Sequence, residues 1–570
     1  MSKNTFNRAL AGLLCGAFMS GALASNMVSG LGGRLVDAPN VGARGVAYQA
    51  SIGNTARTIQ SKLDENVSAL DCGAAANGTT DDKAAIATCD AAAATAGQTL
   101  RLTKGTYRIA SNVTLASAVV FDPGAVIKPD ASVTVTFSQN FQAGNSYQIF
   151  NLANSGALIS LPYNLTHVWA EWWGAKGDAT KTDNQIPINQ ALAAVAATAS
   201  GGTGVADGTV SIGRGWFLIS AGISIPNYTS LRGVSAGYTV IQANTGTWSG
   251  NQMFTATNGT SPMFDSRIEN LRISANKIAA ITYAVYSNAW QEKSGLRNVL
   301  LKDFMNYGVY YEIGYGGAAV LPFIDCEIFP DNTSSNSTGV FVTNTSSQGW
   351  LNVTFERTTI GTSNASPTNV TGVRADNRVN LILNGLHVEG VTNGFLLTTG
   401  ASVNGAGVNG GAPTTNLFNV ASGWTGNIAV RGARLGGATN MVVDSARSYG
   451  FAALEPYDGD LVWPPSPERP MAAALITGGA SPVISYQGGK YSSAPFASVT
   501  HSSTGLYLVS IAGGAFNTNN IDVQVTSQDS ATPMVNYSQN TTSSFYVTTR
   551  NTSGTLTDSA GFSIKLYSKG

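Results

Sequence analysis

The chain has 570 residues, of which only 11% are charged, and its 32 basic and 32 acidic residues give a formal net charge of zero. This balance excludes the basic surface that nucleic-acid binding requires, so nucleic acid is not expected as a partner. The 64 glycines and the short Val, Ile and Leu runs between Ser, Thr and Asn residues are typical of stacked short strands joined by tight turns. They do not fit the long amphipathic helices of an α/β enzyme.

The N-terminus has the form of a secretory signal. Lys3 and Arg8 precede an apolar stretch at 9–24, which ends in small residues before Ser25. The stretch is too short to span a bilayer comfortably. We therefore interpret residues 1–56 as a retained anchor for attachment to a virion, with a cleaved signal at 1–24 as the alternative.

The cysteine and histidine residues suggest no cofactor and no metal site. The four cysteines are widely spaced without a CxxC pair, and the three histidines are scattered; they are Cys15, Cys72, Cys89, Cys326, His167, His387 and His501. We expect the thiols to be free and buried in a chain that folds in a reducing cytosol.

One sequence module occurs twice, about 100 residues apart. In the first copy a Gly-rich turn and a Thr-Asp-Asp segment at 72–82 precede a short helix at 83–94 and a Gly-Thr-Tyr-Arg-Ile strand at 105–109. The second copy has the same order at 173–184, 187–197 and 215–219. Glycine permits the turn, Asp or Asn can cap the helix, and the helix can cover the open end of a strand stack.

These elements resemble the N-terminal part of the pectate-lyase-like right-handed β-helix. The phrase Gln60-Ser61-Lys62-Leu63 and the pair Trp172-Trp173 between the two modules are similar to bacteriophage tailspikes. The motif resemblance covers residues 57–240, and departs from the usual pattern at Cys72 and Asn77. It implies a homotrimer in the virion tail, made in the host cytoplasm. Its partners would be a bacterial surface polysaccharide and, through the N-terminus, a tail, baseplate or portal-adaptor protein.

Beyond residue 265 the sequence predicts the coils of this helix. Alternating apolar and polar segments recur with steps of 28, 29, 32 and 28 residues, aligned on Leu271, Val299, Ile328, Ile360 and Val388. Strict alternation indicates strands and a near-constant step indicates stacking. A Gly-rich stretch at 401–412 is interpreted as an inserted loop, and 428–435 as a last coil.

The predicted fold class is all-β: a right-handed parallel β-helix with short capping helices and a C-terminal antiparallel β-sandwich. Short strands between polar turns predict the sandwich, and a proline cluster predicts the linker before it. The domains are an anchor at 1–56, a head domain with the first module at 57–167, the main β-helix at 168–455, a Pro-rich linker at 456–472 and the sandwich at 473–570, which would hold a trimer together or bind glycan.

Four carboxylates on neighbouring coils are the catalytic candidates: Asp325, Glu327, Glu356 and Glu389. Adjacent coils lie about 4.8 Å apart, which suits the carboxyl separations of glycosidases. Glu327 or Glu356 would protonate the glycosidic oxygen, and Asp325 or Glu389 would act as base or nucleophile. The alternative is that they are surface carboxylates paired with Arg357, Arg297 or Lys302.

Six residues are the candidates for binding substrate: Trp290, Tyr310, Tyr315, Trp350, Arg357 and His387. Aromatic rings can stack on the apolar faces of sugars, although packing in the core or between subunits explains them equally well. His387 beside Glu389 could abstract a proton in a lyase reaction while an arginine holds a uronate, or it could be an ordinary solvated residue.

The function that these observations favour is recognition and depolymerisation of a capsule or O-antigen by glycoside hydrolysis or elimination. A non-catalytic tail adhesin or structural spike is one alternative. A secreted bacterial β-helix polysaccharide enzyme is another.

Overall fold

The computed structural model describes two compact units, residues 1–165 with 172–174 and residues 166–171 with 175–570. The described residues are 35–37, 46–48, 57–58, 66–152, 156–165, 167–199, 208–258, 261–313, 320–331, 336–345, 349–362, 367–412, 414–422, 424–434, 440–443, 451–456, 472–489, 496–511, 521–541 and 543–568. The expected anchor and linker therefore lie almost wholly outside them. In the described part, no helix is both long and apolar enough to cross a membrane.

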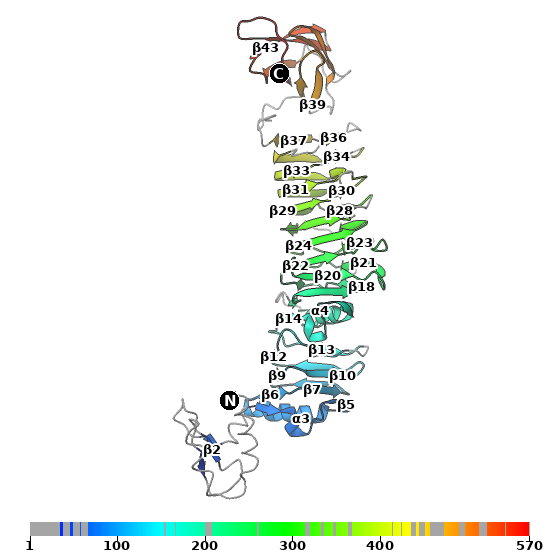
Figure 1. Cartoon of the computed structure of the whole chain (residues 1–570), viewed down its shortest axis with the longest axis vertical. Coiled ribbons are helices and arrows are strands. Elements are labelled where there is room, and N and C mark those ends of the chain that lie inside the picture. Colours follow the sequence, from blue (N-terminus) through cyan, green and yellow to red (C-terminus); the bar gives the residue numbers. More distant parts are fainter. Residues whose placement is uncertain are drawn as a thin grey trace, which may run out of the picture. The chain divides into compact units, whose positions relative to one another are not determined.

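The first unit is a short stack of parallel coils (Figure 1). Its described strands form three parallel sheets: β4 (Asn66–Ser68), β6 (Thr99–Leu102), β9 (Ala118–Phe121) and β12 (Phe141–Gln142); β5 (Asn77–Asp81), β7 (Gly105–Ile109) and β10 (Ala125–Pro129); β8 (Val113–Leu115), β11 (Thr134–Phe137) and β13 (Leu158–Ser160). Strands β1 (Leu35–Asp37), β2 (Val46–Tyr48) and β3 (Arg57–Thr58) pair antiparallel. Two 3-10 turns, η1 (Ala69–Cys72) and η2 (Ala170–Trp173), introduce the two copies of the module.

The two copies of the module have the same pattern of hydrogen bonds. Asp82 accepts from Ala75 N at 2.6 Å just before helix α3 (Lys83–Ala96), and Asn184 accepts from Lys176 N at 2.6 Å just before α4 (Gln185–Ala199). Each side chain thus ties the preceding glycine turn to its helix instead of capping the helix itself. Both helices pack against the first strands of their own unit, as the duplicated sequence predicts.

The cysteine prediction was wrong for two residues. Cys72 in η1 and Cys89 in α3 form a disulfide with a Cα–Cα distance of 5.8 Å. The two cysteines are 17 residues apart in the sequence, and they come together because the buried face of α3 packs against η1. The sequence does not show this contact, so the pairing was not predicted. Cys326 is a buried free thiol, as expected, and Cys15 lies outside the described residues.

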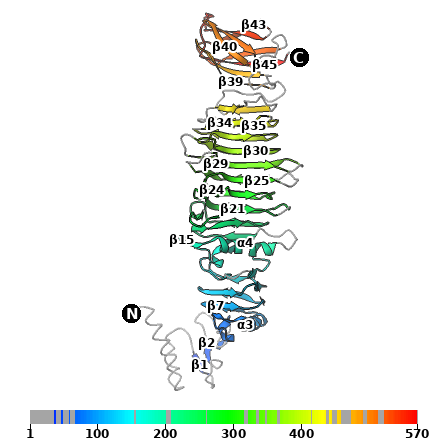
Figure 2. The same ribbon diagram turned by 90° about the vertical axis from the view of Figure 1, so that its right-hand side faces the viewer.

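The second unit contains the main right-handed parallel β-helix, whose stacked strands are seen in Figures 1 and 2. The larger described sheet holds β14 (His167–Trp169), β15 (Asp178–Asp183), β16 (Gly208–Ser211), β17 (Gly215–Ile219), β19 (Thr229–Arg232), β20 (Thr239–Ala243), β22 (Arg267–Ser274), β24 (Gly295–Phe304), β26 (Val320–Ile324), β27 (Glu327–Pro330), β29 (Leu351–Gly361), β31 (Val379–Glu389), β33 (Ser402–Gly410), β35 (Asn427–Ala433) and β37 (Phe451–Pro456). The smaller holds β18 (Ala221–Ser224), β21 (Ser249–Ala256), β23 (Tyr283–Ser287), β25 (Tyr307–Ile313), β28 (Thr338–Asn344), β30 (Thr371–Asp376), β32 (Asn393–Leu397), β34 (Asn416–Val420) and β36 (Asn440–Val443).

The core of the helix consists of inward side chains stacked coil upon coil. One ladder runs Ile273, Leu301, Ile328, Ile360, Val388, and each of these residues is fully buried. The predicted alignment placed Leu271 and Val299 in this ladder, two residues out of register. Side chains alternate with a period of two, so a shift of two residues leaves the apolar pattern unchanged and sequence cannot detect it.

From β22 to β35, each coil of the larger sheet bends at a residue with positive φ. These bend residues are Asn270, Asn298, Asp325, Arg357, Gly385, Gly407 and Gly432, with φ between 45° and 78°. Non-glycine residues rarely adopt this conformation, and Asn and Asp tolerate it best. Asp325 and Glu327 are both exposed, as predicted, but Asp325 lies at the bend and only Glu327 lies on a strand.

The Gly-rich stretch at 401–412 is not an inserted loop. Most of it is strand β33, which pairs with β31 and β35 inside the stack. A Cβ atom at Gly405 would lie 2.1 Å from the Leu383 carbonyl oxygen of the preceding coil. Glycine is needed here for close backbone approach, a requirement that looks the same in sequence as a flexible loop.

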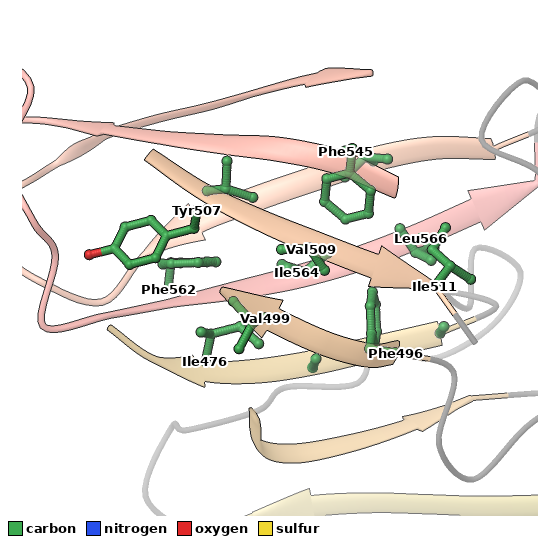
Figure 3. Close-up of a cluster of buried hydrophobic side chains, with 14 residues drawn as sticks. Ile476, Phe496, Val499, Tyr507, Val509, Ile511, Phe545, Phe562, Ile564 and Leu566 are labelled. Carbon is green, nitrogen blue, oxygen red and sulfur yellow. The ribbon is translucent and has the colours of Figure 1, made fainter. Parts of the chain in front are cut away.

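The C-terminal part contains two four-stranded antiparallel sheets that share one apolar core (Figure 3). The described strands of one sheet are β38 (Ala472–Thr477), β39 (Val483–Gly489), β42 (Ile521–Ser527) and β45 (Gly561–Ser568); those of the other are β40 (Phe496–Ser503), β41 (Leu506–Ile511), β43 (Met534–Thr541) and β44 (Ser544–Arg550). Tyr507 and Phe562 pack ring against ring across the core, 5.1 Å apart. The arrangement is a β-sandwich.

A buried carboxyl group lies at the start of the main helix. Glu171 Oε1 accepts from Gly213 N at 2.7 Å, whereas Oε2 is buried with no described partner. Burial raises the pKa of Glu171 to about 7, against the lowering effect of its backbone hydrogen bonds. Because the folded pKa exceeds the usual value of 4.5, protonation stabilises the fold, and this contribution is complete below pH 4.5 and lost as the pH rises through about 7.

We therefore expect Glu171→Gln to leave stability unchanged near pH 4 and to increase it near pH 8. The shift corresponds to a gain of roughly 3 kcal/mol at most. Denaturant unfolding of both proteins across this pH range measures the difference. Parallel stability curves for the two proteins would contradict it.

Candidate functional site

Two rows of outward side chains flank the bend residues of the larger sheet. The row after the bend, called the post-bend ladder, is Trp216, Val240, Arg272, Leu300, Glu327, Thr359, His387, Asn409 and Arg434. All of these residues are at least partly exposed except Val240, which is buried. Consecutive members lie on neighbouring strands, about 4.8 Å apart. It brings together three residues of interest, Trp216, Glu327 and His387, that are up to 171 positions apart in sequence.

Asp325, Glu356 and Arg357 form one ion-paired group. The Arg357 guanidinium donates from Nε to Asp325 Oδ1 at 2.7 Å and from Nη2 to Asp325 Oδ2 at 3.0 Å, and also bonds Glu356. The bond from Arg357 lowers the pKa of Asp325. Asp325 thus stays ionised, which suits a base or nucleophile but not a proton donor. The pairing is the structural alternative that the sequence left open for these carboxylates.

Glu327 is the exposed catalytic candidate whose carboxylate has no partner among the described residues. It begins β27, is exposed, and no described residue forms a hydrogen bond or ion pair with it. Of the two proton-donor candidates, Glu356 is bound to Arg357 and Glu327 is not. Glu327 can therefore approach a substrate without first breaking an internal contact.

His387 and Glu389 point outward from β31 on either side of the buried Val388, as expected. His387 Nε2 lies 3.1 Å from Glu389 Oε2, and the two side chains are 33% and 42% exposed. A Cβ atom at Gly411, on the next coil, would lie 2.8 Å from Glu389 Cβ and 3.0 Å from His387 Cε1. The glycine thus leaves room for the pair, which sequence inspection of the Gly-rich stretch did not reveal.

Trp290 does not fit the predicted role in sugar binding. Its side chain is fully buried, and its carbonyl oxygen accepts from the Tyr311 hydroxyl inside the core. Trp290 follows β23 and forms an isolated bridge with Met263, and burial of its large apolar area explains the residue. Core packing was the alternative, and the structure supports it.

Tyr310 belongs to an outward aromatic cluster on the smaller sheet, away from the carboxylates. Its ring centroid lies 4.7 Å from that of Tyr283, 4.8 Å from Phe341 and 5.9 Å from Tyr286. Its ring already contacts neighbours on three sides, so little of it is left for stacking on sugar. Trp350 is 45% exposed at the start of β29, and Tyr315 lies outside the described residues.

The sequence analysis missed Trp216. It was assigned only to the strand of the second module. In the structure Phe217 faces the core, whereas Trp216 is 46% exposed. A comparison of the two modules could have identified Trp216, because the first module has the small polar residue Thr106 at the same outward position. A large aromatic residue at an outward position is not required by the fold.

Within the described ranges, no group of three or more His, Cys, Asp or Glu side chains is placed to hold a metal ion. The outward carboxylates and His387 offer organic acid–base chemistry. A free carboxylate and a His–carboxylate pair share one outward surface, as general acid–base catalysis on a glycan requires.

Residues 170–410 match the family described as "Rhamnogalacturonase A/epimerase, pectate lyase-like". The observed coils confirm the predicted parallel β-helix, and this match identifies its middle part as pectate-lyase-like. No curated protein matches the chain in sequence.

Solved structures with a similar course include two tailspikes and an epimerase. The tailspike of E. coli bacteriophage HK620, in complex with a hexasaccharide, has 11% identity and a TM-score of 0.36, over 94% of this chain and 98% of that one. The tailspike gp49 of Acinetobacter baumannii bacteriophage Fri1, a capsular polysaccharide depolymerase, has 12% identity and a TM-score of 0.29, over 71% and 86%. The A-module of Azotobacter vinelandii mannuronan C-5 epimerase AlgE6 has 14% identity and a TM-score of 0.32, over 70% of this chain and 100% of that one.

Proposed function

We propose that this chain binds a bacterial surface polysaccharide, a capsule or O-antigen, along the post-bend ladder and cleaves it there. The observation that carries the proposal is the exposed Glu327 on the same surface as the His387–Glu389 pair. The family match over this part of the helix names carbohydrate-active proteins and supports the same class of substrate.

In the proposed mechanism Glu327 protonates the glycosidic oxygen, and Glu389, held by His387, acts on the sugar as the base. Glu327 and Glu389 lie two strands and two residues apart, which places their Cα atoms about 12 Å from each other. Side chains reaching toward a sugar between them shorten this to the range of inverting glycosidases, in which the base activates a water molecule. Elimination at a uronate, with His387 as the base, uses the same residues.

The proposal extends to a homotrimer carried on a virion tail. The resemblance of the paired modules to tailspikes supports this, as does a C-terminal β-sandwich of the kind expected to hold subunits together. Attachment would use residues 1–56. A non-catalytic tail adhesin would present the same ladders without turnover.

The test is incubation of the purified protein with surface polysaccharides from a panel of bacterial strains. Hydrolysis releases reducing ends, and elimination creates an unsaturated uronate that absorbs in the ultraviolet. We expect one of these products from at least one polysaccharide. If a folded oligomer binds a polysaccharide but forms neither product at any pH tested, the result supports a non-catalytic adhesin and contradicts the depolymerase.

One observation favours a second candidate, a secreted bacterial polysaccharide enzyme. The Cys72–Cys89 disulfide is the kind of bond that forms in oxidising compartments and not in the cytosol. N-terminal sequencing of protein from the producing cell separates the candidates. A mature chain that starts at Ser25 supports secretion, and a chain that keeps residues 1–24 supports the virion anchor.

A further inference from the structure

The post-bend ladder carries an exposed tryptophan at a distance from the proposed catalytic residues. Trp216 on β17 has 46% of its surface exposed and packs into neither sheet's interior. Two residues earlier in the chain, the Arg214 guanidinium lies 4.0 Å from the ring centroid of Tyr238, which is itself 57% exposed. An exposed indole gives apolar contact area of the kind that sugar rings cover.

An arginine without an internal partner follows on the same ladder. Arg272 lies two strands beyond Trp216, and its Nε is buried with no hydrogen-bond partner among the described residues. No described carboxylate forms an ion pair with it, in contrast to Arg267 and Arg357, which pair with Asp265 and Asp325. Because the Nε is buried, an anionic ligand would be bound by the terminal nitrogens of this partly exposed side chain, through charge-assisted hydrogen bonds.

The spacing links both residues to the proposed site. Trp216, Arg272 and Glu327 are separated by two strands each, so Arg272 is about 10 Å from Trp216 and Glu327 about 19 Å from it. A polysaccharide lying along the helix axis would meet the tryptophan, then the arginine, then the carboxylate. A sugar with a carboxylate uses the guanidinium most fully, because it accepts charge-assisted hydrogen bonds that a neutral sugar hydroxyl cannot match.

We propose that Trp216 and Arg272 form a binding subsite for an acidic sugar, so that the substrate is an anionic polysaccharide. The inference rests on the proposed function of the ladder. Trp216 stacks on the apolar face of one sugar, and Arg272 binds the carboxylate of a neighbouring one in a bidentate manner. Both residues position the chain and take no part in bond cleavage.

The experiment uses the full-length protein and the polysaccharide that it cleaves in the strain panel, before and after chemical reduction of its carboxyl groups to alcohols. Tryptophan fluorescence titration gives the dissociation constant, and product formation gives kcat and KM. We expect Arg272→Gln to weaken binding of the native polymer about 10- to 100-fold and Trp216→Ala to weaken it about tenfold. Both should raise KM and leave kcat within about twofold, since the contacts are remote from the reacting bond.

Reduction of the carboxyl groups should weaken wild-type binding as much as Arg272→Gln does, and should abolish the effect of that substitution. Matched controls in other parts of the chain are Arg550→Gln and Tyr163→Ala, both exposed. A cleaved polysaccharide without acidic sugars, or unchanged KM in both variants, would overturn the subsite and leave the depolymerase intact. Failure to bind or cleave any polysaccharide would overturn the proposed function and the subsite together.

Discussion

Replacing Glu327 by Gln should lower kcat for polysaccharide cleavage about 10²- to 10⁴-fold, the contribution typical of a positioned general acid. The amide keeps the shape of the side chain but cannot donate a proton to the leaving oxygen. Because Glu327 is exposed and has no described partner, its replacement should change the free energy of unfolding by less than about 0.5 kcal/mol. Initial rates and a denaturant curve for the same preparation measure both quantities.

Companion variants assign the roles. Glu389→Gln should lower kcat to a similar degree, since the amide cannot activate water. Glu356→Gln should have a small effect, because Glu356 is already bound to Arg357. Glu292→Gln, an exposed glutamate in a turn of the same helix, is the matched control. Full activity in both Glu327→Gln and Glu389→Gln would place the catalytic groups elsewhere on the chain.

Loss of the Cys72–Cys89 disulfide should lower the free energy of unfolding of the first unit by about 3 kcal/mol. The bond closes a loop of 17 residues and joins η1 to the buried face of α3, so its removal returns chain entropy to the unfolded state. The Cys72→Ser/Cys89→Ser variant and reductant-treated wild type should unfold at the same, lower denaturant concentration. The rate of limited proteolysis within residues 66–165 measures the unfolding of the first unit directly.

The double variant also supplies the control for reduction. Its stability should not respond to the reductant, because Cys326 is buried and unpaired. If the reductant leaves wild-type unfolding unchanged, and labelling under denaturing conditions finds the thiols of Cys72 and Cys89 free, the bond does not form in the isolated protein.

The larger features of the fold were predictable because they depend on local patterns. Both helices begin within two residues of their expected starts, and the C-terminal strands form two antiparallel sheets, as the short strands between polar turns predicted. The site was less predictable. Its four carboxylates are outward as expected. Which of them form ion pairs with Arg357 depends on how the bend residues Asp325 and Arg357 of neighbouring coils stack, and sequence spacing does not contain that information.

The sequence by itself determined the class of fold and the outward face of each strand, since alternation with a period of two fixes which side chains face the core. Only the tertiary structure decided the register between coils, the burial of Trp290 and the alignment of Trp216 and Arg272 with Glu327. The physical reason is that coil length varies between turns, so a ladder forms from residues whose separation follows no constant step. The disulfide was decided in the same way, by the packing of α3 onto η1.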